Sequence, residues 1–302
     1  MTQSEQLAVT PVAGVDIAHW NPRRRVRQWG SPTRFARPVN NFGDLLGPLI
    51  VRALVREFGL TAPPADAERR RLVVIGSVVH LAEPGDVVWG AGLTTKPGTE
   101  RDHLPQLDIR AVRGPGTSAL LAERYARPVP EVFGDPGLLL GTLMPQLAVA
   151  PAKRSGTSIV PNLNALATLD NRDDVVNPRW PLRRVLARIA ASELVVGSSL
   201  HGIIVAESLG VPARGVRTPA EGAFKYEDYY RATGRDPDSV LAGTVAEAVA
   251  RGGAEPPEWD PRPLLSAFPT DLWSRTARDD TFGSRLGDSR VMQRESSIKG
   301  EK

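Results

Sequence analysis

The residues with the clearest chemical potential lie between positions 194 and 212, where a serine turn is followed by a histidine. Apolar residues 194–196 are typical of a buried strand, and Gly197-Ser198-Ser199 is typical of a tight turn into a helix. His201 would then stand at the start of that helix, where free backbone N–H groups and the helix dipole favour an anion. An imidazole there can also exchange a proton. The pattern predicts an anion site with proton transfer, or alternatively a capping serine beside a packed histidine.

Four other short segments carry side chains that could contact a ligand, although each also has a structural explanation. The segments are Asn41-Phe42-Gly43-Asp44, Arg113-Gly114-Pro115-Gly116-Thr117, Gly134-Asp135-Pro136 and Phe224-Lys225-Tyr226-Glu227-Asp228-Tyr229-Tyr230. Asp44 could cap a helix, Arg113 could form a salt bridge, and Asp135 could bond its own backbone in a turn. Glu207 and Tyr226 could face a cleft or make structural contacts. Taken singly, none of these segments decides between a ligand site and a structural role.

The composition of the 302-residue chain limits the chemistry further. There is no cysteine, which excludes disulfides and thiolate metal sites, and no two of the four histidines lie within a helical turn of each other. We therefore predict no metal site and no cofactor, and structural roles for His19, His80 and His103. The net charge of +4 comes from a basic set that is mostly arginine, which suits phosphate or carboxylate ligands. No zinc-finger, heptad or RNP pattern occurs, so nucleic acid is not an expected partner.

Two features bear on where the chain acts. No apolar run of about 18 residues occurs, and the first 15 residues lack a basic start followed by an apolar stretch. We therefore expect a cytoplasmic protein. The arginine-rich segment 20–41 could hold an acidic glycan, the donor or an anionic membrane surface, which would add a peripheral membrane contact, or it could be a solvated loop.

The elements that must position these residues follow an alternating pattern. Short β-branched runs alternate with helical stretches, which predicts an α/β fold with parallel strands covered by helices. The clearest strands are 71–75, 86–89 and 109–113, and each leads into a glycine. Backbone can therefore approach a ligand at the carboxyl edge of this sheet. Residues 141–156 are predicted to be an interdomain linker, and the polar residues 276–302 a disordered tail.

These motifs, taken in order, resemble the polysaccharide pyruvyl transferase family. The chain has counterparts of its Asn-x-Gly-Asp, Arg-Gly-Pro-x-Thr and Gly-Asp-Pro motifs, of its Leu-His-Gly signature and of its late aromatic segment, all within residues 15–235. The resemblance implies a glycosyltransferase-B-like fold, in which two Rossmann-like domains face each other across a cleft. We assign residues 1–148 to the acceptor-side domain and residues 149–275 to the donor-side domain.

The resemblance also implies a reaction and a set of site residues. The reaction would transfer pyruvate as a ketal from phosphoenolpyruvate to sugar hydroxyls of a polysaccharide, a cell-wall glycan or a lipid-linked precursor. For His201 the resemblance implies a catalytic or phosphoenolpyruvate-binding role, and we take His201 as the catalytic residue. The donor-binding residues that we expect are Ser198, Ser199, Leu200, Gly202, Arg113 and Arg217, and the expected acceptor or cleft residues are Asn41, Gly43, Asp44, Asp135, Glu207, Lys225 and Tyr226.

Two positions depart from the family pattern. Ser199 stands where many members carry arginine, so Arg113 or Arg217 would have to supply the cation that holds the donor. Asn162 stands where many members carry a histidine. Two alternatives therefore remain beside pyruvyl transfer: a nucleotide-sugar glycosyltransferase on the same fold, with Glu207 bound to the ribose, and a non-catalytic glycan-binding descendant.

Overall fold

The computed structural model describes most of the chain as a mixed α/β protein. The described residues are 7–27, 34–68, 70–96, 99, 104–169, 172–218 and 222–275. His103 and the predicted disordered tail at residues 276–302 lie outside them. The predicted α/β class with parallel strands is confirmed. Among the described helices, none combines the length and the apolar character that a membrane crossing requires.

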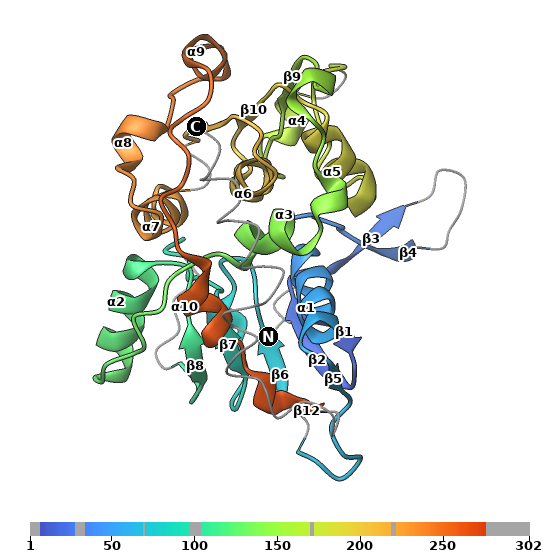
Figure 1. The fold of residues 1–302 in the computed structure, drawn as a ribbon, viewed down its shortest axis with the longest axis vertical. Coiled ribbons are helices and arrows are strands. Elements are labelled where there is room, and N and C mark those ends of the chain that lie inside the picture. The colour runs from blue at the N-terminus through green and yellow to red at the C-terminus, as the bar shows by residue number, and fades with distance from the viewer. Residues whose placement is uncertain are drawn as a thin grey trace.

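A five-stranded sheet occupies the lower part of the molecule in Figure 1. Its strands in spatial order are β1 (Ala8–Val12), β2 (Val15–His19), β6 (Arg71–Val73), β7 (Val87–Trp89) and β8 (Asp108–Ala111). β1 runs antiparallel to β2, whereas β2, β6, β7 and β8 run parallel to one another. Because parallel strands bring their carboxyl ends to one edge, the loops that follow β6 and β8 emerge on the same side.

A three-stranded parallel sheet lies in the upper part of the molecule (Figure 1). Its strands in spatial order are β11 (Ala213–Gly215), β10 (Leu194–Gly197) and β9 (Thr157–Ile159). Single parallel bridges extend it on both sides, from Ile159 to Val175 and from Val216 to Ala242. β10 is therefore a central strand, and its carboxyl end leads into the Gly-Ser-Ser turn.

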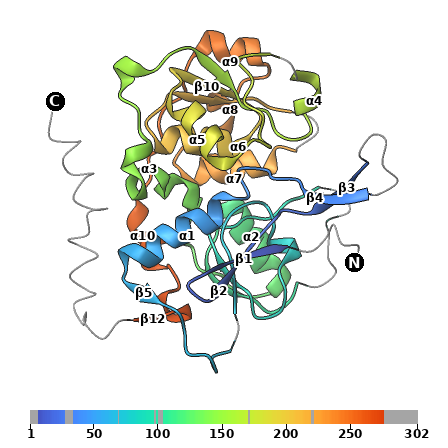
Figure 2. The ribbon, with the colours of Figure 1, turned by 90° about the vertical axis from the view of Figure 1, so that its right-hand side faces the viewer.

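Helices connect and cover these strands, as Figure 2 shows from the side. The α-helices are α1 (Leu46–Glu57), α2 (Pro115–Tyr125), α3 (Leu140–Leu143), α4 (Leu166–Leu169), α5 (Leu182–Ala190), α6 (Leu200–Ser208), α7 (Phe224–Ala232), α8 (Pro237–Val240), α9 (Val245–Arg251) and α10 (Pro261–Ser266). Short 3-10 helices are η1 (Val79–Leu81), η2 (Pro136–Leu139), η3 (Pro145–Leu147), η4 (Pro151–Lys153) and η6 (Thr270–Leu272). The predicted linker, residues 141–156, thus holds short helical turns.

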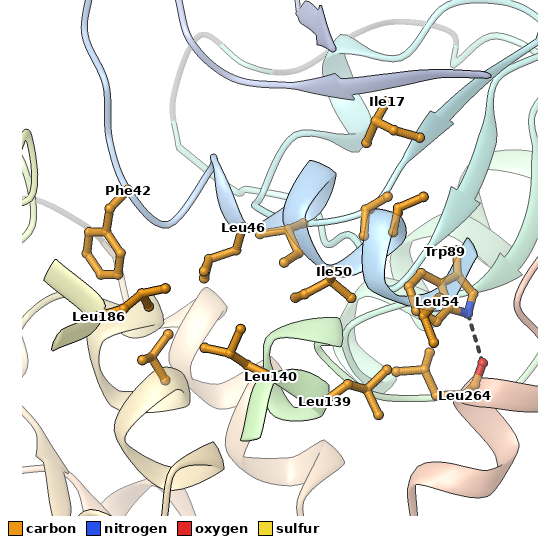
Figure 3. Close-up of a cluster of buried hydrophobic side chains, with 14 of the residues drawn as sticks. Ile17, Phe42, Leu46, Ile50, Leu54, Trp89, Leu139, Leu140, Leu186 and Leu264 are labelled. Atoms are coloured by element: carbon orange, nitrogen blue, oxygen red, sulfur yellow. Dashed lines mark hydrogen bonds between the residues drawn. The ribbon is translucent and has the colours of Figure 1, made fainter. Parts of the chain in front are cut away.

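One apolar cluster joins the two sheets through α1. Leu46, Ile50 and Leu54 recur at four-residue spacing, so they share one face of α1, and none of them has exposed surface. In Figure 3 this face lies next to Leu140 of α3, with Leu186 of α5 beyond it. Each fully buried side chain of this kind stabilises the fold by roughly 1.5–3 kcal/mol. The packing holds the loops of one sheet at a fixed place relative to those of the other.

The last described residues return to the five-stranded sheet. Trp89 donates its indole N–H to the carbonyl of Leu264 at 2.8 Å, and Trp273 donates to the carbonyl of Val12 at 3.1 Å. The two-residue strands β5 (Leu60–Thr61) and β12 (Ser274–Arg275) pair beside these contacts. The domain boundaries at 148/149 and 275/276 remain predictions, and residues 261–275 make contacts with the first sheet although they follow the second in the chain.

The arginine-rich segment contains an antiparallel hairpin rather than only the predicted loop. β3 (Arg23–Arg27) pairs with β4 (Arg34–Pro38), and the register sets Val26 opposite Phe35. Val and Phe favour strands, and arginine carries no strong preference against them, so a charged stretch can still pair. These two strands were not predicted from the sequence, because the segment is highly charged.

Candidate functional site

A pocket of about 320 Å³ lies where the loops after β6, β7, β8, β9 and β10 meet. Its described lining residues are Trp20, Asn41, Asp44, Gly76, Ser77, Val78, His80, Leu81, Thr94, Thr95, Lys96, Thr99, Arg113, Asn162, Leu163, Ser199, Leu200, His201, Phe224 and Lys225. Residues from four of the five motifs reach this one space. The sheets are thus joined so that their carboxyl edges share a pocket.

The serine turn forms the N-terminus of α6. Ser199 has an extended backbone and its hydroxyl accepts a hydrogen bond from the backbone N–H of Gly202 at 3.2 Å, which makes it the N-cap. Ser198 is turned away from the pocket: its hydroxyl accepts from the N–H of Asn162 at 3.1 Å, and its carbonyl accepts from the hydroxyl of Tyr226 at 2.7 Å. Ser199 and Leu200 therefore line the pocket, whereas Ser198, Gly202 and Tyr226 support the turn.

His201 is the second residue of α6. Its side chain lines the pocket and is closely packed by its neighbours. Its side chain is 13% exposed. Gly43 lies so close to the imidazole that a Cβ at position 43 would stand 2.2 Å from Nδ1. Burial, together with the positive charges of Arg113 and Lys225, lowers the pKa of His201 to about 3, so the imidazole is neutral at pH 7.

Asp135 lies behind His201, in the Gly-Asp-Pro turn that begins η2. Its carboxylate is fully buried, and Oδ1 accepts from the backbone N–H of Gly137 at 2.9 Å, as the predicted turn requires. Oδ2 has no hydrogen-bond partner and lies 3.7 Å from Nε2 of His201. Burial raises the pKa of Asp135 to about 6, although the Gly137 N–H and Arg113 partly offset that rise. A carboxylate thus contacts the imidazole from the side opposite the solvent.

Arg113 forms the salt bridge that was one of its two predicted roles, and it also lines the pocket. Its Nε donates to Oδ2 of Asp228 at 3.0 Å, with both side chains buried, and its Nη1 donates to the hydroxyl of Ser77 at 2.7 Å. Asp228 also accepts from the backbone N–H and the hydroxyl of Thr117, at 2.8 and 2.7 Å. Gly114 allows this approach, because a Cβ there would fall 2.0 Å from the carbonyl oxygen of Asp228. The Arg-Gly-Pro-x-Thr motif and the late aromatic segment are therefore one buried unit.

The charged side chains of the pocket are mostly basic. Lys96, Arg113 and Lys225 are the lysines and arginines among its described lining residues, and Asp44 is the carboxylate among them. Asp44 is not the N-cap residue of α1, which is Leu45. Instead, Asp44 accepts a short hydrogen bond from the side chain of Asn41. The lysines and Arg113 could thus bind an anionic ligand, and the carboxylate of Asp44 could accept a hydrogen bond from a hydroxyl group.

Two residues predicted for the site lie elsewhere. Arg217 does not line the pocket and forms a close ion pair with Asp238 at the surface. Glu207 forms a buried ion pair with Arg235, with Oε1 and Nη1 2.6 Å apart, and accepts a short hydrogen bond from the hydroxyl of Tyr229. Glu207 thus makes structural contacts, which was one of its two predicted roles.

The structure adds pocket residues that the sequence did not single out. They are Trp20, Ser77, Val78, His80, Leu81, Thr94, Thr95, Lys96, Thr99 and Leu163. Ser77 had a local signal, because it follows the glycine at the end of a predicted strand. His80, which was predicted to be structural, also borders the pocket. Nothing in the sequence pointed to Lys96, which lies in the long connection between β7 and β8.

Gly43→Ala should cost stability by crowding His201. Gly43 does not have a positive φ, and the three atoms nearest to an added Cβ all belong to His201, with Nδ1 at 2.2 Å. We expect the free energy of unfolding in urea to fall by about 1–3 kcal/mol, the usual cost of overpacking. Gly47→Ala is the control, because its Cβ would meet Val74 at an ordinary 3.4 Å and should change stability by less than about 1 kcal/mol. Equal stability of the two variants would contradict the close packing of Gly43 on His201.

Comparison with known proteins agrees with the order of the motifs. The family model described as polysaccharide pyruvyl transferase matches residues 41–218, which is more than half of the chain. The chain belongs to this family. The match begins at Asn41 and includes Arg113, Asp135 and His201, whereas Lys225 and Asp228 lie beyond its end.

One relative and one solved structure show how similar this chain is to individual proteins. This polysaccharide pyruvyl transferase family member is 30% identical to the succinoglycan biosynthesis protein ExoV of Rhizobium meliloti over 227 residues, which cover 70% of this chain and 68% of that protein. A solved structure of an uncharacterised protein from Klebsiella pneumoniae is 12% identical, with a TM-score of 0.43, and the similarity covers 68% of this chain and 89% of that chain.

Proposed function

We propose that this chain transfers pyruvate from phosphoenolpyruvate to two hydroxyls of a sugar, as a ketal, during the synthesis of an exopolysaccharide or a related glycan. Membership of the polysaccharide pyruvyl transferase family supports the transferase activity. The similarity to a succinoglycan biosynthesis protein supports a polysaccharide as the acceptor.

The observation that carries the proposal is the charge distribution around His201. Phosphoenolpyruvate has a phosphate and a carboxylate on one small carbon frame, so a site for it needs several cations. Lys96, Arg113 and Lys225 line the same pocket as His201, whose imidazole can exchange a proton. Arg113 and Lys225 are close enough to lower the pKa of His201. Bound anions would reverse that effect, because they favour the protonated imidazole.

The proposed reaction balances without a further reactant. The oxygen of the first sugar hydroxyl bonds to C2 of the donor, and its proton passes through the neutral imidazole of His201 to C3, which becomes a methyl group. The C2–O bond to phosphate then breaks, and phosphate leaves with the electron pair while the cations stabilise its charge. The second hydroxyl bonds to C2, and its proton leaves with the phosphate.

Asp44 and Asn41 are the proposed contacts for the sugar. Asp44 is a pocket carboxylate held by the side chain of Asn41, so it can accept a hydrogen bond from a hydroxyl of the acceptor. It would also repel the anionic donor. We therefore propose that the donor lies toward the lysines and Arg113, and the acceptor toward Asp44.

We also propose a glycosyltransferase-B-like architecture and a cytoplasmic location for this chain. The pocket residues that follow strands of both sheets support a glycosyltransferase-B-like arrangement of two Rossmann-like domains across a cleft. The expected location is cytoplasmic, where phosphoenolpyruvate is available. A lipid-linked acceptor would bring the protein to the membrane, and the arginines of β3 and β4 would suit an anionic surface.

Calorimetric titration with phosphoenolpyruvate tests the donor, with a uridine-diphosphate sugar as the comparison ligand. We expect saturable binding of phosphoenolpyruvate and none of the nucleotide sugar. The reverse result would favour the glycosyltransferase alternative, in which Glu207 would first have to leave Arg235. Binding of neither ligand, together with no phosphate release from phosphoenolpyruvate in the presence of mixed glycan acceptors, would favour a non-catalytic descendant.

Lys225→Gln should weaken the binding of phosphoenolpyruvate by about 10–100-fold, because a hydrogen bond to a charged group contributes roughly 1.5–3 kcal/mol. The amide keeps much of the length of the lysine but loses its charge. Lys153→Gln, in the exposed turn η4 outside the pocket, is the control and should bind the donor like the wild type. Equal affinities in all three proteins would remove Lys225 from the donor site.

A further inference from the structure

Three helices in the described part of the chain begin with the same Asp-Pro pair. Asp135 begins η2, Asp236 begins α8 and Asp260 begins α10, each with an extended backbone and a proline next. In every case the carboxylate accepts from the backbone N–H two residues later, at 2.9 to 3.3 Å. Capping a helix start therefore explains Oδ1 of each aspartate, and for Asp236 it also explains Oδ2, which accepts from the N–H of Ser239 at 3.2 Å.

Only the first of these three caps is buried. Asp236 and Asp260 are exposed, as capping residues usually are, whereas Asp135 has no exposed surface. A buried carboxylate loses its hydrogen bonds to water. Oδ2 of Asp135 has no hydrogen-bond partner in the structure that would replace them. A cap does not require burial, and the cap made by Asp135 leaves Oδ2 unused, so the burial of this carboxylate requires another explanation.

The second oxygen faces a matching unpaired atom. Nε2 of His201 is also buried without a hydrogen-bond partner, and it lies 3.7 Å from Oδ2 of Asp135. A movement of less than 1 Å would bring the two atoms within hydrogen-bond distance. The other ring nitrogen, Nδ1, lies on the side of Gly43. The imidazole thus has one nitrogen directed to a carboxylate and the other toward the loop that borders the pocket.

We propose that Asp135 is a positioning residue that holds His201 as the tautomer with its proton on Nε2, so that Nδ1 is the nitrogen that exchanges protons with the substrate. Asp135 does not line the pocket, and therefore acts through His201. Other charges around the pair are Arg113 and Lys225 near the imidazole, and Arg113 and Asp228 near the carboxylate. The inference rests on the proposed function, because the exchanged proton is the one delivered to C3.

Asp135→Asn separates this role from the cap. The amide oxygen can still accept from the N–H of Gly137, but the amide NH₂ then faces Nε2 and must donate to it. The proton of the neutral imidazole moves to Nδ1, and the proton-accepting lone pair points away from the pocket. We expect kcat to fall by about 10³–10⁴-fold with KM within about threefold of the wild type, because a catalytic histidine held in the wrong tautomer loses about 10⁴-fold in kcat.

The tautomer can be measured directly on the whole protein. The chain has four histidines, so ¹⁵N-histidine labelling gives a sparse long-range ¹H–¹⁵N spectrum, and His201→Gln identifies the signals of His201. Above pH 7 the wild type should show a protonated, pyrrole-type Nε2 and a pyridine-type Nδ1. Asp135→Asn should exchange the two. Asp260→Asn, which changes an exposed cap of the same kind, should keep the wild-type spectrum and kcat.

The outcomes separate the inference from the proposed function. A wild-type kcat in Asp135→Asn, or an unchanged tautomer of His201, would overturn the positioning role. Exchange of the tautomer together with the loss of kcat at constant KM would support it. If the wild type turned over no phosphoenolpyruvate at all, the proposed function would fail, and the positioning role would fail with it even if the spectrum showed the hydrogen bond.

Discussion

His201→Gln is expected to lower kcat for pyruvyl transfer by about 10²–10⁴-fold, the usual contribution of a general acid–base residue. Glutamine approximates the size of the imidazole and can hydrogen-bond to Asp135, but it cannot carry the proton from the sugar hydroxyl to C3. The cations of the pocket remain, so the affinity for phosphoenolpyruvate should change less than kcat. Phosphate release with saturating donor and acceptor measures the first quantity, and calorimetry the second.

The matched control is His19→Gln. His19 is buried at the end of β2, bonds to the hydroxyl of Thr10 at 3.0 Å and does not line the pocket. This variant should keep wild-type kcat even if it loses some stability. A folded His201→Gln protein with full turnover would disprove the proton-transfer role, and the reaction would then need another acid among the pocket residues.

Asp228→Ala should give the largest loss of stability among the changes considered. It leaves the guanidinium of Arg113 buried without its carboxylate and removes the acceptor of both hydrogen bonds from Thr117. Removing one partner of a buried ion pair costs about 3–5 kcal/mol, because the remaining charge is neither solvated nor paired. We expect the urea midpoint to fall accordingly with an unchanged slope.

An exposed ion pair provides the comparison for Asp228→Ala. Asp174 bonds to Arg172 at 2.6 Å, yet both side chains are largely exposed to solvent, so Asp174→Ala should cost less than about 1 kcal/mol. Similar costs for the two variants would mean that water reaches Arg113 when Asp228 is lost. Asp228→Ala should also weaken phosphoenolpyruvate binding, since Arg113 would no longer be held toward the pocket.

The buried unit of Arg113, Thr117 and Asp228 explains why two motifs far apart in the chain occur together. Nε of Arg113 and Oδ2 of Asp228 are bonded across 115 positions of sequence. The two motifs were interpreted separately from the sequence: Arg113 as a ligand contact or a salt bridge, and Tyr226 as a cleft residue or a structural contact. Their contact places α7, and with it Lys225, at the edge of the pocket formed by the earlier strands.

Local patterns in the sequence predicted the elements that are built from local interactions. Helix α1 follows from apolar residues at helical spacing, and the strand–turn–helix unit around His201 follows from an apolar run, a glycine and a capping serine. The antiparallel strand β1 was missed, because Ala8–Val12 contains a proline and only its pairing with β2 makes it a strand. The order of the motifs was enough to indicate the family.

Patterns among neighbouring residues were thus enough to predict the α/β class, the family and the histidine at a helix start, because periodicity, turn chemistry and motif order are local properties. Which side chains meet depends instead on how the chain packs. The packing brought Asp135 to His201 and Asp228 to Arg113, added Lys96 to the pocket, and left Arg217 and Glu207 paired elsewhere. The physical reason is that a charged side chain pairs with whatever group the packing brings within reach, and that packing depends on contacts between distant loops.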